Sequence, residues 1–498
     1  MRNPNPMITA DYLVIGAGAM GMAFTDVILT ETDATVVLVD RHAKPGGHWN
    51  DAYPFVRLHQ PSAFYGVNSR PLGADRKDTQ GWNEGLYELA SGAEVLAYFD
   101  QVMRHQFLPS ARVQYFPMCD YAGSEPAGAE ASAIGSGTVG RFVSLASGER
   151  FEVAVTTRVV DATYMNVTVP SVRPPVYEVA TGVRCCPLND LPRTGRPADG
   201  YVVVGAGKTG ADACLWLLGN GVDPDDISWI MPRDSWYLDR AQIQPGDFFE
   251  TTARCFIDQF RHIAHSTSID DLFDRLEAAG LLLRLDTTVR PTMYRCSTVT
   301  TAELEQLRRI TNVIRMGRVQ RIEVDRIVLD GGVVPTTLDT AHIDCTADGL
   351  ERRPAKPVFE DGLLTLQTVR HCQQVFSAAF IAHVEAAYRT DTAKNHLCGV
   401  VPHPDSDTDW LRTARDNAVN SARWNADDAL QAWLAGARLD GFSTTERPSD
   451  ELITVVMDAI QYAEPAIAKL EQYIAALDAG AASWNPTISR RDPRTSGM

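Results

Sequence analysis

Two glycine-rich loops, each placed between a buried strand and a helix, constrain the fold of this chain more than any other feature. The first lies in DYLVIGAGAMGMAF, from residue 11, and the second in YVVVGAGKTG, from residue 201. Gly16, Gly18 and Gly21 give the first loop the G-x-G-x-x-G spacing of a dinucleotide-binding βαβ unit. In such a unit the first glycine makes a tight turn, the second lets the backbone approach a pyrophosphate, and the third allows close helix packing.

The second loop admits two interpretations. Gly205, Gly207 and Gly210 have dinucleotide spacing, but Lys208 and Thr209 also imitate the end of an ATP-binding phosphate loop. A phosphate loop needs a glycine five residues before its Gly-Lys-Thr, and this chain has valine there. We therefore interpret the segment as a second dinucleotide loop, with Lys208 and Thr209 counted among its cofactor-binding residues.

The strand that follows each helix ends on a residue that indicates which dinucleotide is bound. Residues 36–39 lead to Asp40, 19 residues after the last glycine of the first loop, where a carboxylate can accept hydrogen bonds from a ribose diol. Arg41, next along the chain, is a further cofactor-binding candidate. In the second unit residues 227–232 lead to Arg233, which suits a 2′-phosphate or is an ordinary surface arginine. Two such units in one chain predict bound FAD and NADPH, with hydride passing between them.

A glycine pair after the first unit carries a family resemblance. The segment Pro45-Gly46-Gly47-His48-Trp49 resembles the x-G-G-x-W segment of the flavin-containing monooxygenase group, which includes Baeyer–Villiger and N-hydroxylating relatives. The resemblance implies that Gly47, His48 and Trp49 lie close to the flavin nucleotide. Residues 159–164 and 342–349 look like the two crossovers of that group, each after a hairpin-like segment of alternating residues.

The chain also departs from that group at two places. The segment VYEVATGVRCCPLNDLP, from residue 176, lacks the histidine of the group's F-x-G-x-x-x-H signature. Tyr164 stands where the first crossover has a glycine, and Asp161 precedes it, which predicts a stiffer hinge between domains.

These patterns predict an α/β fold with two Rossmann-like dinucleotide-binding domains, the NADPH domain being inserted into a discontinuous FAD domain. We expect the first part of the FAD domain at 1–170 and the NADPH domain at 171–335, with a helical insertion at about 241–316. The FAD domain resumes at 336–400, and a helical extension follows at 401–498. The extension either packs on the FAD domain or forms a homodimer contact.

Several local features predict element boundaries. Ser91 and Glu94 have capping-box spacing, so a helix should begin there and cover the flavin domain. The segment at about 122–139 is rich in Gly, Ala and Ser, and we expect a surface loop. Pro465 should divide the last helix.

Candidate catalytic residues come from FVRLHQPSAFYGVNS, which begins at residue 55. Arg57, His59 and Gln60 are predicted to touch flavin or substrate, because polar donors in a dry pocket would hold the reacting oxygen. The alternative is a loop whose His and Gln satisfy backbone groups, with Arg57 in a salt bridge. In the resembling group an asparagine lines the flavin in this region, and Gln60 is its closest chemical match.

A helix starting near residue 373 should place the positive end of its dipole toward the flavin pyrimidine. Of the nearby histidines, His371 is the better candidate base, and we expect His383 to be a core or surface residue. The nine cysteines include no C-x-x-C pair, so we predict no disulfide framework, no redox-active dithiol and no metal site. Cys185 and Cys186 are expected to be buried small side chains, because a vicinal disulfide is strained.

Composition limits the classes of function. The 498 residues are 45% hydrophobic and 22% charged, as in an ordinary globular protein of two to four domains. A formal charge of −17 and the lack of a basic run argue against nucleic-acid and membrane partners. No signal peptide or uninterrupted apolar span is evident, which predicts a cytoplasmic protein.

Three functions remain open. The first is an FAD- and NADPH-dependent monooxygenase that takes a small organic substrate and molecular oxygen and inserts one oxygen atom through a C4a-(hydro)peroxyflavin. The second is an FAD/NAD(P)H oxidoreductase that transfers hydride or electrons without oxygen insertion. The third is a nucleotide-sensing protein without turnover, which two complete fingerprints disfavour.

Overall fold

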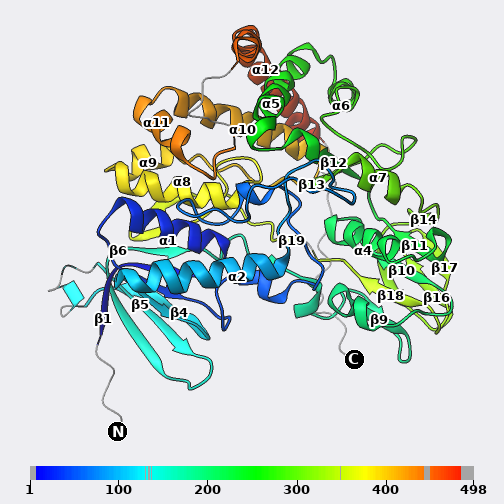
Figure 1. Cartoon of the computed structure of the whole chain (residues 1–498), viewed down its shortest axis with the longest axis horizontal. Coiled ribbons are helices and arrows are strands. Elements are labelled where there is room, and N and C mark those ends of the chain that lie inside the picture. The colour runs from blue at the N-terminus through cyan, green and yellow to red at the C-terminus, as the bar shows by residue number, and fades with distance from the viewer. Residues whose placement is uncertain are drawn as a thin grey trace.

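The computed structural model describes residues 7–128, 131–132, 135, 137–347, 349–441 and 449–483. It is a mixed α/β structure in which two sheets, the first mixed and the second parallel, lie at opposite sides, with helices over and between them (Figure 1). The first sheet has the order β20-β21-β6-β1-β2-β3, and β5 extends it from β6 to β4. Its strands are β1 (Ile8–Ile15), β2 (Val36–Val39), β3 (Val113–Phe116), β4 (Cys119–Pro126), β5 (Thr138–Ser144), β6 (Arg150–Asp161), β20 (Phe359–Glu360) and β21 (Leu363–Thr365).

The second sheet has the order β14-β11-β10-β18-β9, and each neighbouring pair is parallel. Its strands are β9 (Arg184–Pro187), β10 (Tyr201–Val204), β11 (Ile227–Ile230), β14 (Val313–Ile314) and β18 (Ala341–Asp344). Because β18 pairs with β10, this sheet continues past the boundary expected at 335. The chain rejoins the first sheet with β20 and β21, and β21 pairs with β6.

Three smaller sheets accompany these two. A four-stranded sheet contains β8 (Glu178–Val179), β15 (Val319–Ile322), β16 (Arg326–Leu329) and β17 (Gly332–Pro335), the last three antiparallel as the second hairpin-like segment predicted. Two further pairs join β12 (Ser235–Asp239) to β13 (Met293–Val299) and β7 (Val167–Thr168) to β19 (Gly349–Leu350). The prediction of a surface loop at about 122–139 is wrong at both ends of that range. Residues 122–126 belong to β4 and residues 138–139 belong to β5, and these two strands pair antiparallel.

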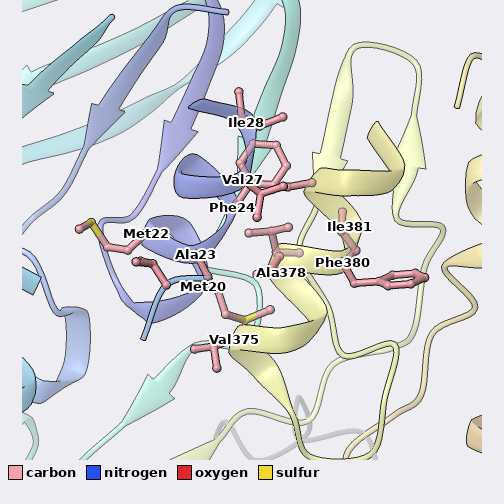
Figure 2. Close-up of a cluster of buried hydrophobic side chains, with 14 of the residues drawn as sticks. Met20, Met22, Ala23, Phe24, Val27, Ile28, Val375, Ala378, Phe380 and Ile381 are labelled. Carbon is pink, nitrogen blue, oxygen red and sulfur yellow. The ribbon is translucent and has the colours of Figure 1, made fainter. Parts of the chain in front are cut away.

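Helices cover the sheets and enclose the core. Figure 2 shows the two helices α1 and α8 packed side by side, with Phe24, Val27, Ala378 and Ile381 between them. The capping box expected at Ser91 and Glu94 is present at the start of α2. The helices are α1 (Ala19–Glu31), α2 (Gly92–Val102), α4 (Lys208–Gly219), α5 (Phe249–His265), α6 (Ile269–Ala278), α7 (Thr301–Leu307), α8 (Gln374–Ala387), α9 (Asp391–Leu397), α10 (Asp407–Asn425), α11 (Asp428–Gly436) and α12 (Asp450–Ser483).

The last helix differs from its prediction. Helix α12 runs without a break through Pro465, which was expected to divide it. Tertiary packing compensates for the hydrogen bond that proline removes, because α12 lies against α5 and α10 and buries Ala466 and Leu470. Residues 484–498 of the predicted extension lie outside the described residues. Among the residues described, no helix is long and apolar enough to cross a lipid bilayer.

Candidate functional site

The first glycine loop has the backbone that its sequence predicts. Gly16 adopts a φ of +101°, and a Cβ on Gly21 would lie 1.9 Å from the Gly16 carbonyl oxygen. Helix α1 begins after Gly18, with no side-chain cap and no acidic residue in its first turn. Its first N–H groups are therefore suited to an anionic diphosphate. Gly46 donates its N–H to the Ala17 carbonyl at 2.8 Å, which brings the glycine pair of the x-G-G-x-W segment onto this loop.

The second loop repeats this geometry. Gly205 has a φ of +129°, and a Cβ on Gly210 would lie 2.1 Å from the Gly205 carbonyl oxygen. Helix α4 begins after Gly207, again with no side-chain cap and no acid in its first turn. A Cβ on Gly207 would meet nothing within 4 Å. The chain thus leaves a cradle of backbone donors over Gly207 that fits a diphosphate.

The first unit ends in an acid, Asp40, which directly follows strand β2 and is held by its own loop. We call this residue the acidic tip. Asp40 is buried, and its two carboxylate oxygens accept hydrogen bonds from the Ala17 N–H at 2.6 Å and the His42 N–H at 2.7 Å. The His42 ring lies between Asp40 at 3.0 Å and Asp51 at 2.9 Å. Hydrogen bonding to Asp40 and then to Asp51 raises the pKa of His42 to about 9 despite partial burial. Arg41, by contrast, is exposed and pairs with an exposed aspartate at 3.4 Å.

The second unit ends in a base, Arg233, which lies just beyond strand β11. We call this residue the basic tip. Arg233 donates to both carboxylate oxygens of Asp405, at 3.1 and 3.0 Å. Arg295 and Arg352 contact the same carboxylate, Arg295 at 2.6 Å and Arg352 at 2.9 Å. Burial raises the pKa of Asp405, but hydrogen bonds from Arg295 and Arg233 outweigh it and leave the pKa below its ordinary value. Three guanidinium groups around one carboxylate give this tip a net positive charge, which suits an anionic ligand.

The two crossovers are built alike. At the end of β6, Asp161 accepts hydrogen bonds from the N–H and hydroxyl of Thr163, at 2.8 and 2.7 Å. At the end of β18, Asp344 accepts the same two bonds from Thr346, at 3.1 and 2.6 Å. Tyr164 donates its hydroxyl to the Pro354 carbonyl at 2.7 Å and so ties the first crossover to the segment beyond the second. Asp348 of the second crossover lies outside the described residues.

A cavity of about 330 Å³ brings several of the predicted residues together. The second loop contributes its three central residues, and the x-G-G-x-W segment and the segment from residue 55 line the other side. The glycines of the first loop and Asp40 are not among its lining residues. The predicted residues that do line it are His48, Trp49, Arg57, His59, Gln60, Gly207, Lys208 and Thr209.

Two histidines on this cavity are neutral at physiological pH. Burial, with Lys208 and Arg240 nearby, lowers the pKa of His59 to about 3, and burial lowers the pKa of His48 to about 4. The His59 Nδ1 is buried without a hydrogen-bond partner in the described part of the chain. An uncharged ring with an unsatisfied nitrogen is suited to a ligand that supplies the missing bond. Arg57 is instead exposed, and its guanidinium donates to the Leu89 carbonyl at 3.2 Å.

Lys208 is fixed by its own helix. Its ammonium pairs with Asp212 one turn along α4, and Asp212 also accepts a 2.5 Å hydrogen bond from the Tyr53 hydroxyl. Because Tyr53 follows the x-G-G-x-W segment, this bond joins the two nucleotide units across the cavity. Burial, followed by the charge of Asp212, raises the pKa of Tyr53 well above its ordinary value, so the phenol stays protonated.

The cysteine prediction needs correction. Cys296 on β13 and Cys372 before α8 form a disulfide, although we expected none. Their 76-residue separation carries no sequence signal, because only the fold brings the two segments together. Donor atoms of Cys296, Cys372 and His403 lie within 4.8 Å of one another, where the sequence predicted no such cluster. His371 contacts this group, with its Nε2 3.3 Å from the Cys296 Sγ.

The other expectations for these residue types hold in part. Cys185 and Cys186 are free thiols, but they are half-buried and not buried as expected. His383 is structural, because its Nδ1 lies 2.7 Å from a Glu31 carboxylate oxygen and its ring stacks on Trp433.

Comparison with known proteins gives structural neighbours but no matching family model. A scan against protein-family models finds no match. Among solved structures, a flavin-containing monooxygenase from Stenotrophomonas maltophilia has a TM-score of 0.43 and 16% identity, over 78% of this chain and 99% of that one. An open crystal structure of cyclohexanone monooxygenase has a TM-score of 0.48 and 13% identity, over 96% of this chain and 98% of that one.

Sequence relatives are far more similar. Uncharacterized proteins of Mycobacterium tuberculosis (strain ATCC 25618 / H37Rv) and Mycobacterium bovis (strain ATCC BAA-935 / AF2122/97) are each 57% identical over 447 residues. The match covers 88% of this chain and 79% of each relative. The chain belongs to the same family as these mycobacterial proteins.

Proposed function

We propose that the chain is an FAD-dependent, NADPH-using monooxygenase that inserts one oxygen atom into a small organic substrate. The observation that carries this proposal is the cavity itself, where the second glycine loop faces the x-G-G-x-W segment and the pair His59 and Gln60. A bound flavin would supply two-electron transfer and the activation of oxygen.

The residues of the chain divide the work of binding. The N-terminus of α1, with Gly16 and Gly18, would hold the FAD diphosphate, and Asp40 keeps acceptor capacity on its carboxylate for a ribose hydroxyl. The N-terminus of α4 would hold the NADPH diphosphate over Gly207, with Arg233 near the 2′-phosphate. These assignments follow from the free helix N-termini and the charges at the two strand tips.

His59 and Gln60 would orient the reacting groups. A neutral His59 has one donor and one acceptor nitrogen, so its unsatisfied Nδ1 can bind a polar ligand atom without adding a charge. Gln60 lines the same wall and adds an amide. Arg57, which is exposed and bonded to backbone, would contribute at the cavity mouth.

A second function is favoured by one observation. The disulfide of Cys296 and Cys372 lines the same cavity, so this cavity also suits an FAD/NAD(P)H oxidoreductase that moves electrons without oxygen insertion.

The test uses purified protein loaded with FAD. Under anaerobic conditions, NADPH should bleach the flavin absorbance. Rapid mixing of the reduced protein with oxygen should then give the transient absorbance of a flavin–oxygen adduct before the absorbance of oxidised flavin returns. Direct return of oxidised flavin, with or without candidate substrates, would contradict the monooxygenase and leave the second function. A colourless protein that takes up no added FAD would contradict both. A His59→Ala variant should still bind FAD but shorten the life of the transient species.

A further inference from the structure

We propose that Cys296 and Cys372 form a redox-active disulfide that takes electrons from a reduced flavin bound in the cavity. This inference rests on the proposed flavoprotein function. It assigns the pair a role as a two-electron centre, and it treats the disulfide as more than a cross-link between distant segments.

The position of the pair is the first argument. Both cysteines line the cavity that also contains Gly207 of the second glycine loop and His48 of the x-G-G-x-W segment. A disulfide that only tied β13 to the start of α8 would be equally effective away from this cavity. Here both of its residues line the space in which the nicotinamide and the flavin are proposed to meet.

The surroundings of the two sulfur atoms are the second argument. The His371 Nε2 lies 3.3 Å from the Cys296 Sγ, and the His403 ring is within 4.8 Å of both sulfurs. Burial lowers the pKa of each histidine to about 4, so both rings are neutral and one nitrogen of each can accept a thiol proton. Cys372 also lies at the N-terminus of α8, where the helix dipole stabilises a thiolate.

The backbone is the third argument. Cys296 and Cys372 have φ values of +55° and +54°, in the left-handed region that residues with a side chain rarely adopt. Such strained residues gather at functional sites, where the surrounding structure holds them in place.

The remaining cysteines provide a contrast. The other seven are free thiols. Burial raises the pKa of Cys185 to about 11 and of Cys186 and Cys255 to about 12, which suppresses thiolate formation. Within the described residues, the chain therefore places one sulfur pair in a reactive setting and keeps the other thiols inert.

The electron balance is simple. Reduction of the pair breaks one S–S bond and forms two thiols, which requires two electrons and two protons. A reduced flavin bound in the same cavity would supply both electrons and both protons and would itself become oxidised. His371 accepts or returns the proton at the Cys296 Sγ, and the Cys372 sulfur stays beside the helix N-terminus.

The experiment counts thiols as well as electrons. FAD-loaded protein is treated anaerobically with NADPH, quenched, alkylated and analysed by mass spectrometry for labels at residues 296 and 372. We expect both positions to change from disulfide to labelled thiol, and the reduced protein should take up about two NADPH per flavin instead of about one. The Cys296→Ser and Cys372→Ser variants should take up about one. Cys185→Ser, a matched free cysteine, should behave as the parent protein.

Several outcomes would overturn the proposal. A disulfide that persists beside fully reduced flavin would exclude the electron route while leaving the proposed function intact. Two permanently reduced cysteines, or a pair that purifies with a bound metal ion, would exclude the redox centre. A protein that binds no FAD would refute the proposed function and the route together. In that case equilibration with dithiothreitol, followed by the same labelling, shows separately whether the disulfide opens reversibly.

Discussion

The two βαβ units share one backbone but differ at their tips. Both place the first glycine at positive φ, pack the third against the carbonyl of the first, and start an uncapped helix at the second. The first unit then ends in Asp40, buried and bonded to its own loop, whereas the second ends in Arg233, paired with Asp405. Under the proposed function, the shared part serves a diphosphate, and the different part serves the choice between FAD and NADPH.

The two units also differ in how open their glycine loops are to a ligand. Gly47 packs over the first loop so closely that a Cβ on it would lie 2.9 Å from the Gly18 Cα, while Gly207 of the second loop lines the open cavity. Under the proposed function, we expect a tightly held flavin in the first unit and an exchangeable nicotinamide nucleotide in the second.

The largest expected effect comes from adding one methyl group to the third glycine of either unit. Gly21→Ala and Gly210→Ala each place a Cβ about 2 Å from a backbone oxygen, which forces the helix away from its loop. Gly21→Ala should purify without flavin, whereas Gly210→Ala should remain yellow and lose reduction by NADPH. Flavin absorbance of the purified protein and the anaerobic rate of bleaching measure the two effects separately.

Gly207→Ala is the matched control, because it makes the same chemical change where no atom lies within 4 Å. It should melt at the parent temperature yet bind NADPH about tenfold more weakly, since the methyl fills the phosphate cradle. Equal NADPH affinity in this variant would show that the cradle over Gly207 holds no phosphate. Loss of flavin from Gly210→Ala would contradict the division of the two nucleotides between the units.

The shared backbone was the part that sequence could predict. Glycine spacing, the flanking apolar strands and the capping box at Ser91 are local signals, and each specifies its geometry within a few residues of chain. The two crossover segments carry similar local signals, and their aspartates accept hydrogen bonds two residues onward.

The differences between the units depend on long-range partners, which sequence does not contain. Asp405 reaches Arg233 from 172 residues away, and Cys372 reaches Cys296 from 76 residues away. Arg57 lines the cavity as an exposed residue bonded to the Leu89 carbonyl, and its expected contact with flavin or substrate stays a prediction. Pro465 was expected to break a helix, yet packing against α5 and α10 outweighs the lost hydrogen bond. Local rules fail where tertiary contacts supply the larger energy.

A smaller effect is expected from the basic tip. Arg233→Ala should raise the KM for NADPH about tenfold and leave the KM for NADH nearly unchanged, because a charged hydrogen bond to the 2′-phosphate is lost. Steady-state kinetics with both coenzymes on FAD-loaded protein measure the ratio.

The control is Arg352→Ala, which removes a different guanidinium from the same Asp405 carboxylate. It should change the two KM values alike. If both arginine variants discriminate equally against NADPH, the preference comes from the net charge around Asp405, and no specific contact with Arg233 is required.

The smallest expected effect lies at the acidic tip and depends on pH. Because the folded state raises the pKa of His42 from 6.5 to about 9, the protonated ring stabilises the fold fully below about pH 6.5 and loses this contribution as the pH rises through 9. The ring is partly exposed, so His42→Gln should lower Tm by only about 1–2 °C at pH 6. That difference should vanish near pH 10.

A variant of the second unit shows whether the pH dependence of the His42→Gln difference comes from the charge of the ring. Arginine side chains in general do not titrate between pH 6 and pH 10, so any Tm difference for Arg233→Ala should be the same at the two pH values. Thermal melts of the parent and both variants at the two pH values therefore separate a titrating tip from a permanently charged one. A His42→Gln difference that persists at pH 10 would mean that His42 stabilises the first loop through packing, with no contribution from its charge toward Asp40 and Asp51.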